Sequence, residues 1–326
     1  YSGGASCPAL LLEPQRTNQL AHSEYLSGWN AYSPSSTIVN NRAISPQGVQ
    51  NACEITFTGS GNDFAYDNLY YSVTAPSVFS IYLRVASGTK VVSLRTGIGN
   101  EYEAVTITTE WQRFELNITS TKASERVGID NRATYGGSGT AGTIEVWGAQ
   151  LEAGSYPTSY IPTYGTSVTR SKDDMDTTFS SALATNGSAT IFFHELGVAD
   201  SDDINTTAGR YRYQKDSNNY ISLTTNATAW RVRIQSGGAS NFRGLNDHLK
   251  TDSVKIAIVV SSTHFSVFAN GVKEIDNEAL AATADFSSID DFTTTIEESV
   301  GARRAVQHAV FPTALTDSEC IALTTI

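Results

Sequence analysis

Residues 147–152 (WGAQLE), continuing through 156–163 (YPTSYIPT) to 168–170 (VTR), decide how this chain of 326 residues is divided. The stretch begins where a predicted strand ends, and it passes into a short polar segment, 164–167 (YGTS). Two prolines within 156–163 fix the backbone angle φ and stiffen the approach to that segment. We therefore expect one β-rich domain to close here and a second one to open.

The first half of the chain contains short segments in which apolar and polar residues alternate. Such alternation puts apolar side chains on one face of a strand and polar side chains on the other. Gly, Ser, Asn and Thr separate the segments, which favours an antiparallel sandwich with one solvated face on each sheet. The clearest segments are 78–85 (VFSIYLRV), 91–95 (VVSLR), 111–118 (WQRFELNI) and 144–147 (IEVW).

The second half of the chain also contains short apolar and alternating segments, although its sequence does not repeat that of the first half. Asn270-Gly271 lies between two apolar runs, and this pair predicts a two-residue hairpin because both of its positions tolerate a positive φ. Thr316 with Glu319 three residues later predicts a capping box and a short helix near the end of the chain. The predicted strands include 189–193 (ATIFF), 220–224 (YISLT), 230–234 (WRVRI), 254–260 (VKIAIVV) and 265–274 (FSVFANGVKE).

These patterns predict an all-β protein of two tandem antiparallel sandwiches (jelly rolls) with little helix. We place the first domain at 1–165 and the second at 166–326. Each is long enough to bury a core of its own.

The composition excludes some classes of partner. The formal net charge is −11, so backbone phosphates would not be neutralised and we expect no nucleic-acid partner. No apolar run approaches the roughly 18 residues that a membrane span needs, so we expect no membrane insertion. The chain opens without Met, and we read it as a fragment or a processed chain.

Three cysteines (Cys7, Cys53 and Cys320) leave at least one unpaired, and no disulfide framework is implied. We expect buried free thiols, with pairing of Cys7 and Cys53 as the alternative.

The first half resembles the carbohydrate-binding-module-like jelly rolls of bacteriophage fibre and spike proteins. The matching stretches occur in order along the chain. They are 11–18 (LLEPQRTN), 22–24 (HSE), Trp29, 45–48 (SPQG), 111–114 (WQRF) and 147–170. The resemblance implies a structural Ca²⁺ held through an N-terminal acidic residue, for which Glu13 is the match.

The second half resembles the concanavalin A-like, laminin-G-type sandwich. The stretches that carry this resemblance are 268–273 (FANGVK), Gly301 and 310–320 (VFPTALTDSEC). Together the two resemblances imply a fibre or spike on a phage tail or head, located on the virion; an extracellular location is the alternative. They also imply binding of host cell-surface polysaccharide, assembly as a homotrimer and contacts with other virion proteins, with the 153–172 linker as a candidate for contacts between chains.

Aromatic side chains flanked by polar groups are the candidate sugar-binding residues, because a ring stacks on the apolar face of a pyranose while the polar groups bond its hydroxyls. Packing in a core is the alternative for each of them. The candidates are Trp29, Tyr66, Asp67, Asn68, Tyr70, Tyr71, Arg210, Tyr211, Tyr213 and Trp230.

Little in the sequence indicates catalysis. The five histidines show no metal-ligand spacing, and no serine nucleophile motif accompanies them. We therefore expect a non-enzymatic adhesion protein without a cofactor. The alternatives are a secreted bacterial carbohydrate-binding or adhesin protein and a purely structural fibre segment; a polysaccharide depolymerase ranks below both.

Overall fold

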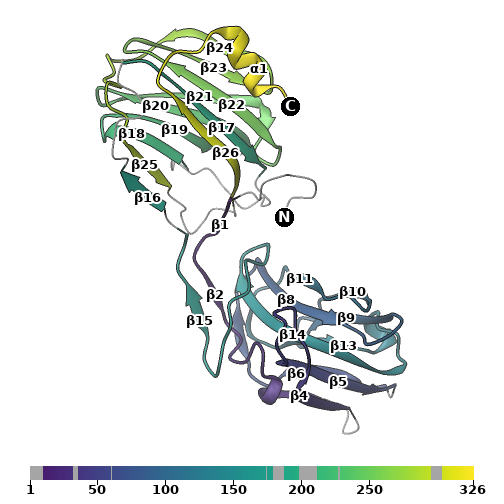
Figure 1. Ribbon diagram of the computed structural model, residues 1–326. Coiled ribbons are helices and arrows are strands. Elements are labelled where there is room, and N and C mark those ends of the chain that lie inside the picture. Colours follow the sequence, from purple (N-terminus) through teal and green to yellow (C-terminus); the bar gives the residue numbers. More distant parts are fainter. Residues whose placement is uncertain are drawn as a thin grey trace. The chain divides into compact units, whose positions relative to one another are not determined.

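The computed structural model divides the chain into two compact units, each described here by itself (Figure 1). The central unit is Gln15–Ser171, and the flanking unit combines Tyr1–Pro14 with Lys172–Ile326. The structure describes residues 10–31, 36–59, 61–173, 175–178, 187–197, 211–226, 228–294 and 303–326.

The central unit contains two antiparallel five-stranded sheets. One has the strand order β10-β9-β13-β6-β3, and the other has the order β11-β8-β14-β5-β4. The strands of the first sheet are β3 (Trp29–Ala31), β6 (Phe64–Asp67), β9 (Lys90–Thr96), β10 (Tyr102–Ile107) and β13 (Val127–Asp130). Those of the second are β4 (Thr37–Ala43), β5 (Ala52–Thr58), β8 (Ser77–Arg84), β11 (Gln112–Ile118) and β14 (Ala141–Ala153).

The alternation seen in the sequence explains how these two sheets form a sandwich. In β9, Val92 and Leu94 enter the core, and the residues that alternate with them, Ser93 and Arg95, lie on the opposite face. In β8, Phe79, Ile81 and Leu83 enter the same core from the other sheet, and all three are fully buried. One apolar core therefore lies between the sheets, and the outer face of each sheet remains for other roles.

Shorter elements complete the central unit. Two two-stranded pairs are β2 (Arg16–Asn18) with β15 (Val168–Arg170), and β7 (Tyr71–Val73) with β12 (Lys122–Glu125). Two 3₁₀ turns are η1 (Leu26–Gly28) and η2 (Ala133–Tyr135).

The flanking unit contains two six-stranded antiparallel sheets, and 23 of its described residues form a buried core that draws on both. The first sheet, in spatial order, is β1 (Leu10–Leu12), β26 (Arg303–Phe311), β17 (Ala189–Leu196), β22 (Val254–Val260), β23 (His264–Ala269) and β24 (Val272–Ala279). The second is β16 (Met175–Thr178), β25 (Asp291–Thr294), β18 (Tyr211–Asp216), β19 (Asn219–Thr225), β20 (Ala229–Ser236) and β21 (Ala239–Leu249).

Two predicted local motifs are confirmed in the flanking unit. Asn270 and Gly271 adopt φ values of 47° and 83° and join β23 to β24, as a tight hairpin requires. Helix α1 (Asp317–Thr324) begins at a capping box, in which Thr316 accepts from the Glu319 amide and the Glu319 carboxylate accepts from the Thr316 amide. No helix among the described residues is long and apolar enough to cross a membrane.

The all-β class with little helix is confirmed. The first described strand, β1, pairs with β26, so residues 10–12 lie in the flanking unit, whereas the sequence placed them with the first domain. Cys53 and Cys320 are buried free thiols, and Cys7 lies outside the described residues.

Candidate functional site

The outer face of the sheet β10-β9-β13-β6-β3 gathers aromatic and charged side chains. Strand register brings them into one row across the sheet. Tyr66 lies opposite Gly128, Gly128 lies opposite Arg95, and Arg95 lies opposite Tyr102. In a second row Asp130 lies opposite Phe64. We call this surface the arginine–aromatic face and define it by Phe64, Tyr66, Tyr70, Arg95, Arg126, Asp130, Arg132 and Tyr135.

Arg95 stands at the middle of this face and is only 5% exposed. Its guanidinium lies 3.8 Å from the centroid of the Tyr135 ring and 4.8 Å from that of Phe64. Its Nη2 donates to the Asn100 side chain at 2.5 Å, whereas its Nε is buried without a hydrogen-bond acceptor among the described residues. Burial lowers the pKa of Arg95, although a guanidinium remains charged at neutral pH.

Asp130 holds two of the arginines in place. Its carboxylate is fully buried and accepts two parallel bonds from Arg132, from Nε to Oδ1 at 2.9 Å and from Nη2 to Oδ2 at 2.6 Å. The same carboxylate lies 3.5 Å from Arg95 Nη1. Such a bidentate pair fixes the guanidinium plane, so Arg132 is oriented before any ligand arrives.

Arg126 joins two of the aromatic candidates. Its guanidinium lies 3.9 Å from the Tyr70 ring centroid and 5.0 Å from that of Tyr66, and its Nε is also buried without an acceptor among the described residues. The Glu125 carboxylate shapes the neighbouring loop, because it accepts from the backbone amides of Ile98 and Gly99 at 2.6 Å each.

These side chains surround a cavity of about 240 Å³, which we call the arginine pocket. The lining residues are Phe64, Tyr66, Arg95, Gly97, Ile98, Arg126 and Arg132. Three guanidinium groups in and around the pocket face two carboxylates, Asp130 and Glu125, so the site keeps one net positive charge in a chain of net charge −11. Its chemistry is that of an anion-accepting pocket with aromatic walls.

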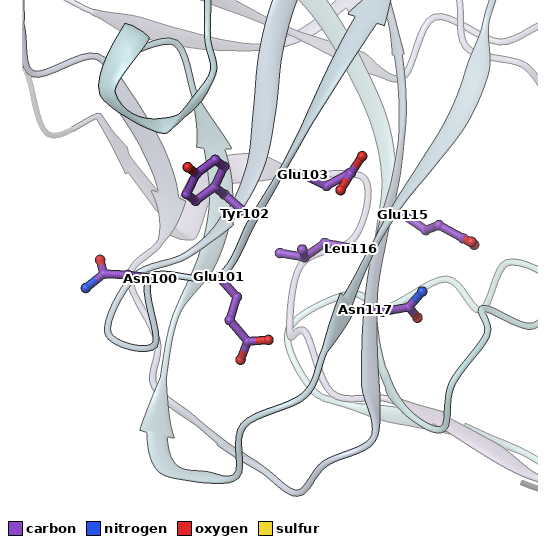
Figure 2. Close-up of a pocket in the computed structure, with 7 residues that line it drawn as sticks. All are labelled: Asn100, Glu101, Tyr102, Glu103, Glu115, Leu116 and Asn117. Atoms are coloured by element: carbon purple, nitrogen blue, oxygen red, sulfur yellow. The ribbon is translucent and has the colours of Figure 1, made fainter.

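A second hollow, the acidic groove, is lined by residues of β10, of β11 and of the loop before β10 (Figure 2). Its volume is about 550 Å³, and its lining is Asn100, Glu101, Tyr102, Glu103, Glu115, Leu116 and Asn117. Asn100 accepts the bond from Arg95, and Tyr102 is the strand neighbour of Arg95, so the two hollows share a border. The exposed carboxylates of Glu103 and Glu115 suit the hydroxyls of a neutral ligand and repel an anion.

The predicted cluster at residues 64–71 is divided by the fold. Tyr66 and Tyr70 lie on the arginine–aromatic face, and Tyr70 is 55% exposed. Asp67 instead points inward, where it is fully buried and accepts a 2.6 Å bond from the Tyr71 hydroxyl. Burial raises the pKa of Asp67 in spite of that bond. Asn68 is exposed, and its backbone amide donates to the Gly28 carbonyl.

Four other predicted site residues are corrected by the structure, because their side chains fill cores. Trp29 is 5% exposed in the core of the central unit. Tyr211, Tyr213 and Trp230 are at most 6% exposed in the core of the flanking unit. A large aromatic residue is an efficient filler of space between two sheets. Arg210 lies outside the described residues.

Glu13, the predicted Ca²⁺ ligand, lies beside Asp173. Its backbone amide donates to the Asp173 carboxylate at 2.9 Å, and Asp173 returns a bond to the Glu13 carbonyl. No group of three or more His, Cys, Asp or Glu side chains that could hold a metal occurs in the described part of the chain. A structural Ca²⁺ therefore stays a prediction from the sequence alone.

Sequence reasoning did not find Arg95, Arg126, Arg132 or Tyr135. Arg95 ends an alternating segment that the sequence predicts as a strand. The alternation puts Arg95 on the outward face of that strand, and this signal could have identified it. The other three lie in or beside short elements without periodicity, where only the folded chain brings them to the pocket.

Comparisons with known proteins give distant structural likenesses. No known family matches the sequence, and no curated protein matches it. Among solved structures, 46% of the chain is similar to 28% of a NanB sialidase variant from Streptococcus pneumoniae, at 13% identity and a TM-score of 0.33. The same share is similar to 97% of CBM40 of the Ruminococcus gnavus IT-sialidase, bound there to alpha2,3 sialyllactose (15% identity, TM-score 0.34). The receptor binding domain of botulinum neurotoxin mosaic serotype C/D shows 10% identity and a TM-score of 0.36, over 47% of this chain and 41% of that one.

Proposed function

We propose that the central unit is a non-catalytic glycan-binding module and that the arginine pocket and the acidic groove form its binding site. The observation that carries the proposal is the Nε of Arg95, which is buried at the pocket with no acceptor in the described part of the chain, while Arg126 and Arg132 also line the pocket. An unsatisfied buried donor beside a cavity is favourable for a ligand that brings an acceptor.

The arginine pocket and the acidic groove suit different groups on one ligand. A carboxylate on a sugar in the arginine pocket would accept from guanidinium groups, and Tyr70 offers an exposed ring beside it. The sugar next to it would lie in the acidic groove, where its hydroxyls donate to Glu103 and Glu115 and a second carboxylate would be repelled. The ligand is then a glycan with an acidic sugar beside a neutral one.

In its wider role the chain acts in adhesion, as part of a phage fibre or spike that attaches to the surface polysaccharide of a host. Support for this part of the proposal comes from the sequence resemblance. Weak contacts of this kind become firm attachment when several copies act on one surface, which fits the homotrimer that the resemblance implies.

The test measures binding of the fluorescently labelled chain to a panel of bacterial cells, before and after periodate oxidation of their glycans. Arg126→Ala is compared with Arg42→Ala, a control that removes an exposed arginine from β4 of the other sheet. Hydrogen bonds to charged groups contribute about 1.5–3 kcal/mol, so Arg126→Ala should weaken binding roughly 10- to 150-fold and Arg42→Ala should not.

Loss of binding on oxidation, together with the Arg126 effect, would support both the glycan and the site. Equal binding by Arg126→Ala and the wild type would refute the site. Folded protein that binds no cell would move the assignment to a structural fibre segment, and monomeric protein that binds one soluble glycan would favour a secreted adhesin.

A further inference from the structure

A second set of arginines lies on the outer face of the sheet β16-β25-β18-β19-β20-β21 in the flanking unit. Strand register aligns them. Arg212 lies opposite Ser222, Ser222 lies opposite Arg233, and Arg233 lies opposite Phe242. Arg231 lies two residues before Arg233 on the same face of β20, because Trp230 and Val232 enter the core. We call Arg212, Arg231 and Arg233 the arginine ladder.

Two aromatic rings hold the ladder together. The Tyr220 ring centroid lies 4.2 Å from the Arg212 guanidinium and 5.3 Å from that of Arg233. The Phe242 centroid lies 4.8 Å from the guanidinium groups of both Arg231 and Arg233. Guanidinium groups and rings therefore alternate, and neighbouring positive charges share one ring.

Among the described residues, no carboxylate pairs with an arginine of the ladder. The side-chain groups to which Arg231 and Arg233 donate are neutral, from Arg231 Nε to Thr224 at 3.2 Å and from Arg233 Nη2 to Ser240 at 3.2 Å. No ladder arginine forms an ion pair within the described ranges, and Arg233 Nε is buried there without an acceptor. By contrast, Arg243 on the adjacent strand is paired with Glu278.

Nearby charged groups do not offset the excess of positive charge at the ladder. Burial, followed by the charge of Arg233, lowers the pKa of Arg231. Asp291, an acidic residue on the same sheet, accepts a 2.6 Å bond from Gln214 rather than from an arginine. Three positive charges with no ion pair among the described residues thus stand together on a chain of net charge −11. Like charges at such close range are unfavourable unless an anion joins them.

We propose that the arginine ladder binds an anionic polysaccharide with carboxylates on successive or alternate sugars. Arg212 and Arg233 are two strands apart, which is about 10 Å, a separation that carboxylates along an extended glycan chain can span. Guanidinium groups suit carboxylates because they can donate two parallel bonds. Nucleic acid is the less suitable polyanion, since arginines already cover the ring faces on which bases would stack. This site is independent of the arginine pocket.

The experiment uses the whole chain carrying Arg126→Ala, so that the arginine pocket does not contribute. Titration calorimetry measures binding of a galacturonic acid hexasaccharide, of its neutral galactose counterpart and of a DNA hexanucleotide. The expected result is binding of the acidic hexasaccharide alone. Adding Arg231→Gln and Arg233→Gln should weaken that binding at least tenfold, whereas Arg243→Gln, on the next strand, should change it less than twofold.

Thermal unfolding checks that each variant is folded. If the double variant does not fold, Arg212→Gln, on a different strand, replaces it as the test variant. No binding of the acidic hexasaccharide, binding of the neutral one with equal affinity, or an equal loss with Arg243→Gln would each overturn the proposal. Tighter binding of the DNA would overturn the assignment to polysaccharide. Loss of cell binding by Arg126→Ala bears only on the arginine pocket, so the two proposals fail separately.

Discussion

Replacement of Gly128 by alanine should damage the central unit far more than a glycine-to-alanine change ordinarily does. Gly128 lies between Tyr66 and Arg95 in the row that crosses the arginine–aromatic face. A methyl carbon added there would lie 2.6 Å from Tyr66 Cα and 2.8 Å from Tyr66 Cβ, and it would also overlap the Ala65 carbonyl oxygen. Carbon atoms pack best at about 3.5–4.0 Å.

The obstructing atoms are mostly backbone, so no side chain can rotate to relieve the overlap. Strands β13 and β6 must instead separate by about 1 Å, and overpacking of this kind costs about 1–3 kcal/mol. For a unit of this size each kcal/mol lowers the melting temperature by about 2–4 °C. We therefore expect Gly128→Ala to melt about 2–12 °C below the wild type, with weaker glycan binding because Tyr66 moves.

Differential scanning calorimetry of the whole chain measures the first effect, and binding to glycan-bearing cells measures the second. Gly61→Ala is the matched control, because a methyl group there would have no neighbour within 4 Å and Gly61 lies outside the left-handed region. If Gly128→Ala melted within about 1 °C of both the wild type and Gly61→Ala and bound as they do, the steric argument and the assigned row would be refuted.

Three further changes test other parts of the structure. Asp63→Asn should cost about 1–3 kcal/mol at pH 7 in urea unfolding. Burial alone would raise the pKa of Asp63, but hydrogen bonds led by those from Ser36 and Asn131 lower it. The stabilisation is therefore present above the unfolded pKa of about 3.9 and is lost as pH falls through the lower folded value, so the two proteins should converge in stability only below that lowered pKa. Trp230→Ala should destabilise the flanking unit by about 3–5 kcal/mol and leave binding at the arginine pocket unchanged. Weaker binding at the arginine pocket would contradict the assignment of Trp230 to a core. Thr316→Ala removes the capping box of α1 and should cost about 1 kcal/mol by urea unfolding, and no loss would show that the cap is dispensable.

The strands were predictable because a half-buried strand alternates apolar and polar residues, and this alternation is visible in the sequence. Segment 91–95 alternates, and β9 (Lys90–Thr96) places Val92 and Leu94 in the core as that alternation requires. The hairpin at Asn270-Gly271 and the cap at Thr316 were equally predictable, since each depends on residues within a few positions of one another.

The binding face was less predictable, because register between distant strands assembles it. Tyr66 and Arg95 become neighbours through Gly128, and nothing local relates the positions of these three residues. Aromatic type alone also does not separate core from surface. Trp230 and Tyr70 were equal candidates in the sequence, yet one is fully buried and the other is 55% exposed.

Pairing of β1 with β26 makes the flanking unit discontinuous in the chain, so the central unit is an insertion within it. The insertion leaves and re-enters its host through β2 and β15, whose paired residues include Arg16 and Arg170. Its two ends are thus already joined by a hairpin-like ribbon. Such an arrangement behaves as a cassette, because another module could replace residues 15–171 without breaking a strand of the host sandwich. A cut at residue 166, by contrast, would strip β1 from β26 and leave a bare edge open to aggregation.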